Sequence, residues 1–102
     1  MIDYRVEVKS DVIEENNVII RSGVTAFHNS AIKEDAFVGP KALVGAYITN
    51  EESTYIGQGV ILISCKAENI GRNTFVGVGA MVTKPLHENV VAVGSPARII
   101  KP

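Results

Sequence analysis

The sequence predicts an all-β fold, a parallel β-helix in which six-residue repeats wind into coils. The first observation is an aliphatic residue at nearly every sixth position over more than half of the chain. The second is that a period of six fits neither an α-helix, with 3.6 residues per turn, nor a strand that alternates every two residues. The third is a glycine directly after many of these positions. A fixed hexapeptide repeat is typical of a β-helical solenoid.

The sixfold repeat forms a ladder of apolar positions. The ladder positions are Ile20, Ala26, Ile32, Val38, Val44, Asn50, Ile56, Leu62 and, after a step of eight, Ile70, Val76 and Val82. We expect their side chains to fill a narrow interior that only aliphatic groups pack without voids. Asn50 is the polar exception. An unpaired buried amide costs about 1–3 kcal/mol, so we expect either polar neighbours or a bulge at Asn50.

Glycine is frequent at the position after the ladder residue. It occurs there at Gly39, Gly45, Gly57, Gly71 and Gly77. We expect these glycines to lie near corners and to adopt a positive φ, which glycine does without steric cost. The step of eight between Leu62 and Ile70 predicts two extra residues that bulge outward at a corner, near residues 66–68.

We expect one domain over residues 1–102. Residues 1–17 keep the period poorly and are interpreted as lead-in and cap, residues 18–84 as the hexapeptide coils, and residues 85–102 as the C-terminal cap. Solenoids need caps because their end coils otherwise expose the interior. A three-sided coil uses about 18 residues, so about four coils fit the chain. Such a short solenoid leaves large faces exposed, and we therefore expect an obligate oligomer.

Composition and charge argue against several classes of function. Ten basic and eleven acidic residues give a net charge of −1, which is not the footprint of a protein that binds nucleic acid or an anionic membrane. The one cysteine, Cys65, suits a reducing cytosol and is interpreted as a small corner residue. We find no signal peptide and no stretch of ~18 apolar residues that would span a membrane. We expect a cytoplasmic protein.

Three segments carry a resemblance to a known superfamily. Residues 70–84 (IGRNTFVGVGAMVTK) and 93–98 (VGSPAR) resemble the end of a hexapeptide-repeat acyltransferase. Residues 24–32 (VTAFHNSAI) are similar to bacterial sugar acetyltransferases, a group that includes sialic acid O-acetyltransferases and amino-sugar N-acetyltransferases. The resemblance covers about residues 12–102. It implies a left-handed parallel β-helix, a homotrimer, and acetyl-CoA as the acyl donor.

His28 is the candidate general base, because the sugar acetyltransferases use a histidine on this rung to deprotonate the acceptor. Histidine suits that role at neutral pH. His28 lies two residues after Ala26, so its side chain should project from a corner. The family often has an acidic residue next, where this chain has Asn29, which we assign to orienting His28 or binding a substrate hydroxyl. The plain alternatives are a surface histidine and a solvated turn asparagine.

The 18-residue coil also predicts columns of corner residues. One column is His28, Ala46, Ser64 and Lys84, and the next is Ser22, Pro40, Gln58 and Val78. In relatives, CoA lies against such columns in a groove between two subunits, where main-chain groups hold its pantetheine arm. The resemblance therefore implies CoA contacts at Ala46, Gln58 and Val78.

Three further residues complete the implied CoA site. Phe37 stands where some relatives have a second histidine near the thioester. Lys84 and Arg98 are candidates for pairing with the CoA phosphates, since such charge-assisted contacts are among the stronger polar interactions. Each of these cations has a plain alternative as a solvated surface residue.

Metal and dinucleotide chemistry fit the sequence poorly. The two histidines, His28 and His87, are the only ones, whereas a catalytic zinc site uses three protein ligands. The glycine-rich residues 76–79 do not open a helix after a strand, as a dinucleotide fingerprint requires. We expect no metal, and we interpret His87 as a residue of the capping loop.

The sequence thus favours an acetyl-CoA-dependent O- or N-acetyltransferase that acts on a sugar, a nucleotide sugar or a similar small acceptor. His28 would deprotonate the acceptor for direct attack on the thioester, and backbone N–H groups would stabilise the oxyanion. The alternative is a non-catalytic β-helix that serves as a trimerisation or binding scaffold. Two features favour it: residues 1–102 do not include the nucleotide-sugar-binding domain usual in those enzymes, and Asn29 carries no charge.

Overall fold

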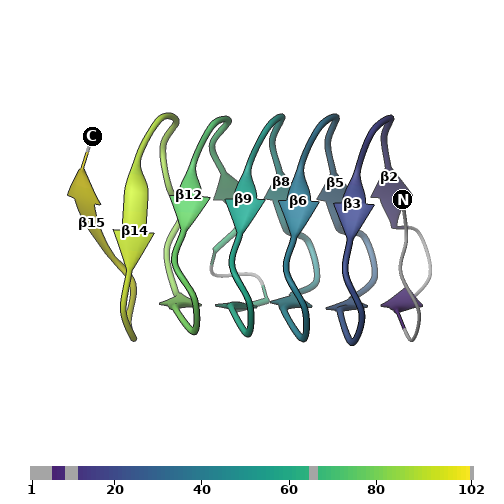
Figure 1. The fold of residues 1–102 in the computed structure, drawn as a ribbon, viewed down its shortest axis with the longest axis horizontal. Coiled ribbons are helices and arrows are strands. Elements are labelled where there is room, and N and C mark those ends of the chain that lie inside the picture. The colour runs from purple at the N-terminus through teal and green to yellow at the C-terminus, as the bar shows by residue number, and fades with distance from the viewer. Residues whose placement is uncertain (1–5, 9–11, 65–66, 102) are drawn as a thin grey trace.

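The computed structural model describes residues 6–8, 12–64 and 67–101, and every regular element within them is a β-strand. The chain winds as an all-β parallel β-solenoid of about four turns, so the predicted architecture is confirmed. Figure 1 shows the strands of successive coils side by side along the long axis of the molecule. Within the described residues, no helix is long and apolar enough to cross a membrane.

The strands stack into three sheets, which we call faces 1, 2 and 3. Face 1 contains β1 (Glu7–Val8), β4 (Thr25–Ala26), β7 (Leu43–Val44), β10 (Ile61–Leu62) and β13 (Met81–Val82). Face 2 contains β2 (Ile13–Glu14), β5 (Ala31–Ile32), β8 (Thr49–Asn50) and β11 (Asn69–Ile70). Face 3 contains β3 (Ile19–Ile20), β6 (Phe37–Val38), β9 (Tyr55–Ile56), β12 (Phe75–Val76), β14 (Val91–Val93) and β15 (Arg98–Lys101). The chain passes from face 1 to face 2 at the first corner, from 2 to 3 at the second, and from 3 to 1 at the third.

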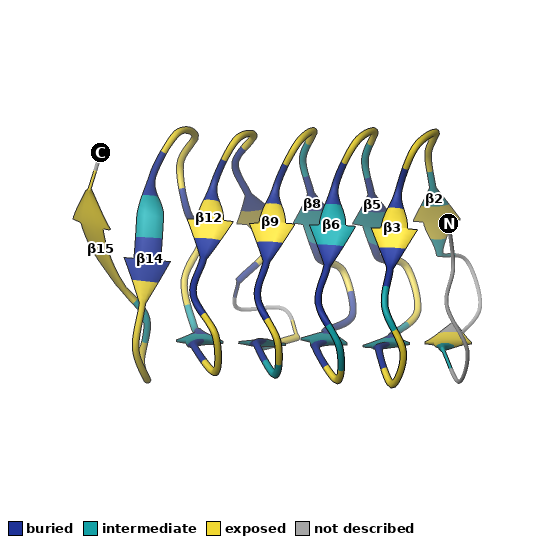
Figure 2. Ribbon diagram, viewed as in Figure 1, coloured by how far each residue is buried: buried dark blue, intermediate teal, exposed yellow. Residues whose placement is uncertain are grey.

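The register of the strands confirms the predicted coil length. Thr25 pairs with Leu43 and Ile19 with Phe37, each 18 residues further along the chain, in parallel. In the two-residue strands from β3 to β13 the first side chain faces out and the second, the ladder residue, faces in. Figure 2 shows this change from exposed or half-buried to buried along β3, β6, β9 and β12.

The interior is lined by two positions of each repeat, most of which hold aliphatic residues. The ladder residues from Ile20 to Val82 are buried, and so are most of the residues two places before them, such as Val24, Ile48 and Val60. These side chains form one continuous core along the solenoid. Burial of the ladder was predicted, because only a period of six brings the same position to the interior on every face.

The repeated glycines have a different role from the one predicted. Gly39, Gly45, Gly57, Gly71 and Gly77 have no positive φ. Positive φ occurs two residues later, as at Asn29 (59°) and Lys41 (62°), where it forms the third position of a four-residue turn. Ala42 N donates to Gly39 O at 3.3 Å across this turn, and a positive φ at the third position is the mark of a type II turn.

Close stacking of the coils explains the glycines instead. A Cβ atom on Gly39 would lie 2.8 Å from the backbone nitrogen of Gln58 in the next coil. On Gly57 it would lie 2.9 Å from the nitrogen of Val78. Real Cβ atoms do not approach the backbone so closely, so Gly39 and Gly57 have no room for a side chain where the next coil lies over them.

The insertion between Leu62 and Ile70 lies at the first corner, as predicted, but it does not simply bulge outward. Ala67 is fully buried and joins the core. Residues 65–66, which include Cys65, lie outside the described residues. The same corner of the following coil is shorter, because the next buried residue after Val82 is Leu86, which bridges Ile70. The two changes offset each other and return the chain to its original register.

Asn50 is another place where the expectation was wrong. Its side chain is fully buried, and β8 pairs regularly on both sides, with Ile32 and with Ile70, so no bulge forms. Neither Asn50 Oδ1 nor Nδ2 has a hydrogen-bond partner among the described residues. The interior therefore holds the Asn50 amide between Ile32 and Ile70 without a hydrogen bond from the described residues.

Both ends of the chain continue the faces. At the N-terminal end, β1 pairs with β4 and β2 pairs with β5. At the C-terminal end, β14 pairs in parallel with β12, and β15 then turns back antiparallel along β14. The residues of β15 are exposed, and Figure 2 shows this strand at the edge of the molecule.

Candidate functional site

His28 lies in the turn that follows β4, at the first corner. Its side chain is exposed, as the sequence predicted from its place two residues after the ladder. Ser30 Oγ donates to Phe27 O at 2.8 Å and braces the turn from within. Asn29, also exposed, occupies the third turn position with a φ of 59°. That conformation explains the asparagine locally, because asparagine tolerates the left-handed region better than most residues.

The predicted first-corner column is present. The pairing of β4 with β7 and of β7 with β10 stacks His28, Ala46 and Ser64 in successive coils. Ala46 is buried, and its backbone N–H donates to Ser64 Oγ at 2.9 Å. Lys84 follows β13 at the same corner and is exposed. The surface above His28 is thus made of one small side chain, one hydroxyl and one cation.

Tyr47 is the residue at this corner that the sequence reasoning missed. Its ring centroid lies 5.5 Å from that of His28, and the two ring planes are nearly perpendicular at 87°. Tyr47 N also donates to His28 O at 3.3 Å. Counting 18 residues from His28 leads to Ala46, so the sequence reasoning considered Ala46 only. Tyr47 is the next residue, and its turn position is the one whose backbone N–H bonds to the preceding coil.

The predicted third-corner column is also present. Gly59 N donates to Pro40 O at 2.9 Å and Gly79 N to Gln58 O at 2.8 Å, so the turns of Pro40, Gln58 and Val78 stack directly. Val78 is highly exposed, with 76% of its surface accessible. Ala46 and the pair Gln58 and Val78 therefore lie at two different corners of one chain.

Phe37 lies on face 3, the face opposite the first corner, so one chain by itself does not place it beside His28. Its ring stacks on Tyr55 at 4.8 Å, and Tyr55 stacks on Phe75 at 4.7 Å, with ring planes within 9° of parallel. Arg98 begins β15 at the end of the same face and is exposed. Lys84 and Arg98 thus come from different sides of the last coils.

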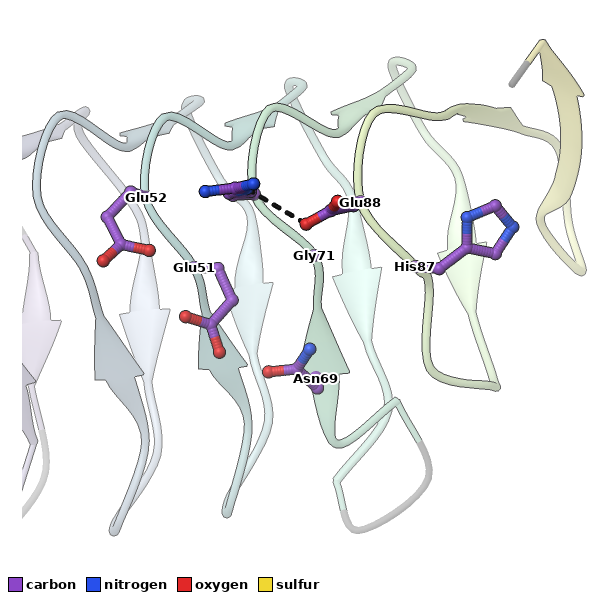
Figure 3. Close-up of a pocket in the computed structure, with 7 residues that line it drawn as sticks. Glu51, Glu52, Asn69, Gly71, His87 and Glu88 are labelled. Atoms are coloured by element: carbon purple, nitrogen blue, oxygen red, sulfur yellow. Dashed lines mark hydrogen bonds and ion pairs between the residues drawn. The ribbon is translucent and has the colours of Figure 1, made fainter.

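A shallow hollow of about 360 Å³ lies apart from the first corner. Its lining comes from three successive coils around the second corner, namely Glu51, Glu52, Asn69, Gly71, Arg72, His87 and Glu88. Arg72 Nε and Glu88 Oε2 form an exposed ion pair at 3.0 Å, and Figure 3 shows Glu51 and Glu52 on one side of it and His87 beyond the other side, turned away from the pair. His28 is not part of this lining. Among the described residues, no group of three histidine, cysteine or acidic side chains is placed to hold a metal ion.

Comparison with known proteins places this geometry in a family. No protein-family model matches the chain. Galactoside O-acetyltransferase of Escherichia coli (strain K12) is 30% identical over 100 residues, which is 97% of this chain and 45% of the relative. Galactoside O-acetyltransferase of Lactococcus lactis subsp. lactis (strain IL1403) is 41% identical over 49 residues, 48% of this chain and 23% of the relative. This chain belongs to the hexapeptide-repeat β-helix acetyltransferase superfamily.

Solved structures show the same superfamily fold. A hexapeptide-repeat acetyltransferase from Vibrio cholerae, in complex with acetyl coenzyme A, superimposes with a TM-score of 0.85 at 14% identity, covering 97% of this chain and 65% of that one. A GDP-perosamine N-acetyltransferase mutant from Caulobacter crescentus, in complex with CoA and GDP-perosamine, gives 0.71 at 22% identity, covering 100% and 58%. The chain spans less than half the length of the two galactoside O-acetyltransferases. The superfamily resemblance inferred from the sequence is confirmed.

Proposed function

We propose that this superfamily member transfers the acetyl group of acetyl-CoA to a hydroxyl or amino group of a sugar, a nucleotide sugar or a similar small acceptor. The observation that carries the proposal is its 30% identity to a galactoside O-acetyltransferase over 97% of its length. Structural neighbours bind acetyl-CoA or CoA, and one binds a nucleotide sugar. The proposed setting is the cytoplasm.

His28 is the proposed general base. It is exposed at a turn, so an acceptor can reach it. In the proposed step His28 takes the proton of the acceptor, the acceptor oxygen or nitrogen attacks the thioester carbonyl carbon, and the carbon–sulfur bond breaks. The thiolate of CoA then takes up the proton from His28. Backbone N–H groups near the corner are the proposed donors to the oxyanion, a contribution that is often large in acyl transfer.

CoA is proposed to bind between two subunits of a left-handed trimer. Its assigned contacts, Ala46 at the first corner and Gln58 and Val78 at the third, lie on separate corners of one chain. A second subunit would bring the third corner of one chain to the first corner of its neighbour. The same arrangement would bring Phe37 of one subunit toward His28 of another, and Lys84 and Arg98 remain the proposed partners of the CoA phosphates.

An acetyl-transfer assay tests the proposal. Release of the CoA thiol is followed with galactosides, maltose and nucleotide-linked amino sugars as acceptors. We expect His28→Ala to lower kcat/KM at least ~100-fold, the scale of losing a general base. His87→Ala is the matched control, because His87 is the other histidine and lines the separate hollow. Equal activity of the two variants would remove His28 from the mechanism.

Ligand binding separates this proposal from a non-catalytic scaffold. A scaffold is favoured by Asn29, which cannot stabilise an imidazolium as a carboxylate would. CoA at 100 times its Kd should stabilise the folded protein by about 2.7 kcal/mol and raise its melting temperature. An unchanged melting temperature with millimolar CoA or acetyl-CoA would contradict the proposed acetyltransferase activity and would favour the non-catalytic scaffold.

A further inference from the structure

Among the described residues, the aromatic ring paired with the His28 imidazole is that of Tyr47 in the next coil. No hydrogen bond or ion pair from the described residues reaches the imidazole, although the His28 carbonyl accepts one from Tyr47 N. A general-base histidine normally needs a partner that orients its ring. Asn29, next in the chain, makes no such bond.

Tyr47 occupies an unusual place for a tyrosine. It is 56% exposed and has a φ of 61°. The left-handed region is unfavourable for bulky residues, by about 1–2 kcal/mol relative to glycine. The same turn position elsewhere in the chain holds small or flexible residues, namely Asn17, Gly23, Asn29, Asp35, Lys41, Ser53, Gly59, Asn73, Gly79 and Asn89. Because Tyr47 is largely exposed, burial of its ring does not offset the cost of this backbone conformation. We therefore look for a local role of the ring, and the ring contact that the structure shows is with His28.

The stacking of the coils creates that contact. Between His28 and Ser64 the column holds Ala46, whose side chain is a single methyl group. Tyr47 follows Ala46, and the hydrogen bond from its backbone N–H to His28 O holds the Tyr47 backbone beside His28. A perpendicular pair with centroids 5.5 Å apart is a favourable aromatic geometry, and it limits the rotamers open to the imidazole.

We propose that Tyr47 is a positioning residue for His28, with its ring taking the orienting part that an acidic neighbour plays in related enzymes. The proposal rests on the proposed function, since it concerns the base of that reaction. The aromatic ring acts through van der Waals and quadrupole contact, so the phenolic hydroxyl is not needed.

Two substitutions distinguish the contribution of the aromatic ring from that of the phenolic hydroxyl and from that of side-chain volume. Tyr47→Phe keeps the ring, and Tyr47→Leu keeps an apolar side chain without it. Asp35→Leu is the control, because Asp35 occupies the same turn position at the second corner with a φ of 63° and carries the same strain from leucine. We expect Tyr47→Leu to lower kcat about 3- to 10-fold while KM for acetyl-CoA stays within about twofold. Tyr47→Phe and Asp35→Leu should match the unsubstituted protein.

Proton NMR of the imidazoles tests the contact without any activity. The chain has two histidines, so His87→Gln assigns the two sets of signals, and His87 serves as internal reference. We expect a ring-current shift of the His28 protons that Tyr47→Phe retains and Tyr47→Leu abolishes. Identical His28 signals in all three proteins would overturn the proposal even if the enzyme is active. If the NMR signals show the contact in the unsubstituted protein but Tyr47→Leu leaves kcat unchanged, the positioning role is overturned. A protein inactive with every acceptor refutes the proposed function, and the positioning role with it, whatever the NMR signals show.

Discussion

The α-carbon of Gly39 lies so close to Gln58 that a Cβ atom on it would be 2.8 Å from the Gln58 backbone nitrogen. Gly39 closes one coil at the third corner and Gln58 lies in the turn of the next. The distance between stacked strands, about 4.8 Å, is set by backbone hydrogen bonds and cannot widen at one corner alone. Glycine at this position therefore controls how tightly the coils stack.

Replacing Gly39 with alanine should destabilise the protein by about 1–3 kcal/mol, the usual scale of overpacking against a rigid neighbour. The control is Gly59→Asn. Gly59 has a φ of 70°, a Cβ atom added to it would meet nothing within 4 Å, and asparagine occupies the same conformation at other turns. We expect that control to change stability by less than about 0.5 kcal/mol. Urea unfolding at fixed protein concentration measures both, and equal losses would contradict the stacking argument.

Removing the buried amide at Asn50 should stabilise the protein. Asn50→Leu keeps the number of side-chain heavy atoms and places an aliphatic group between Ile32 and Ile70. Because neither amide atom has a partner among the described residues, the gain should be about 1–3 kcal/mol. Asn69→Leu is the control on the exposed side of the same face. A melting temperature for Asn50→Leu at or below that of the control would mean that the amide is satisfied in solution.

The aromatic stack on face 3 should contribute to stability through its central ring. Tyr55 contacts Phe37 on one side and Phe75 on the other. Tyr55→Ala removes both contacts, each worth about 0.5–1.5 kcal/mol beyond buried area, so the loss should be about 1–3 kcal/mol. Tyr55→Phe keeps the rings and should be neutral. Thermal unfolding at two protein concentrations separates this effect from any change in subunit association.

The protein should be a trimer at micromolar concentration. Face 3 carries most of the large exposed apolar side chains among the described residues, including Ile19, Tyr55, Phe75, Ile99 and Ile100. Exposed apolar surface of this kind marks an association site. Light scattering should give three times the chain mass of 10.9 kDa. A monomer under these conditions would contradict both the oligomer and the shared CoA groove.

The ladder and the corner columns could be predicted because a whole number of residues forms each coil. Counting by six finds the buried residues, and counting by 18 places Ala46 on His28 and Gln58 on Pro40. The superfamily could be inferred from residues 24–32, 70–84 and 93–98, and kinship with acetyltransferases confirms it. The role of His28 stays a prediction, with its exposed place at the corner in agreement.

The misses share one physical cause, which is contact between coils. The periodicity could not show that Gly39 lacks room because of Gln58, or that Ala67 turns into the core from within an insertion. It also could not place the Tyr47 ring on His28, because that contact depends on a side chain reaching across the gap between two coils. The repeat by itself determined which residues face in, face out or lie at a corner. Only the tertiary structure decided which of them touch, because the spacing and the bends of stacked coils depend on all the backbone hydrogen bonds together.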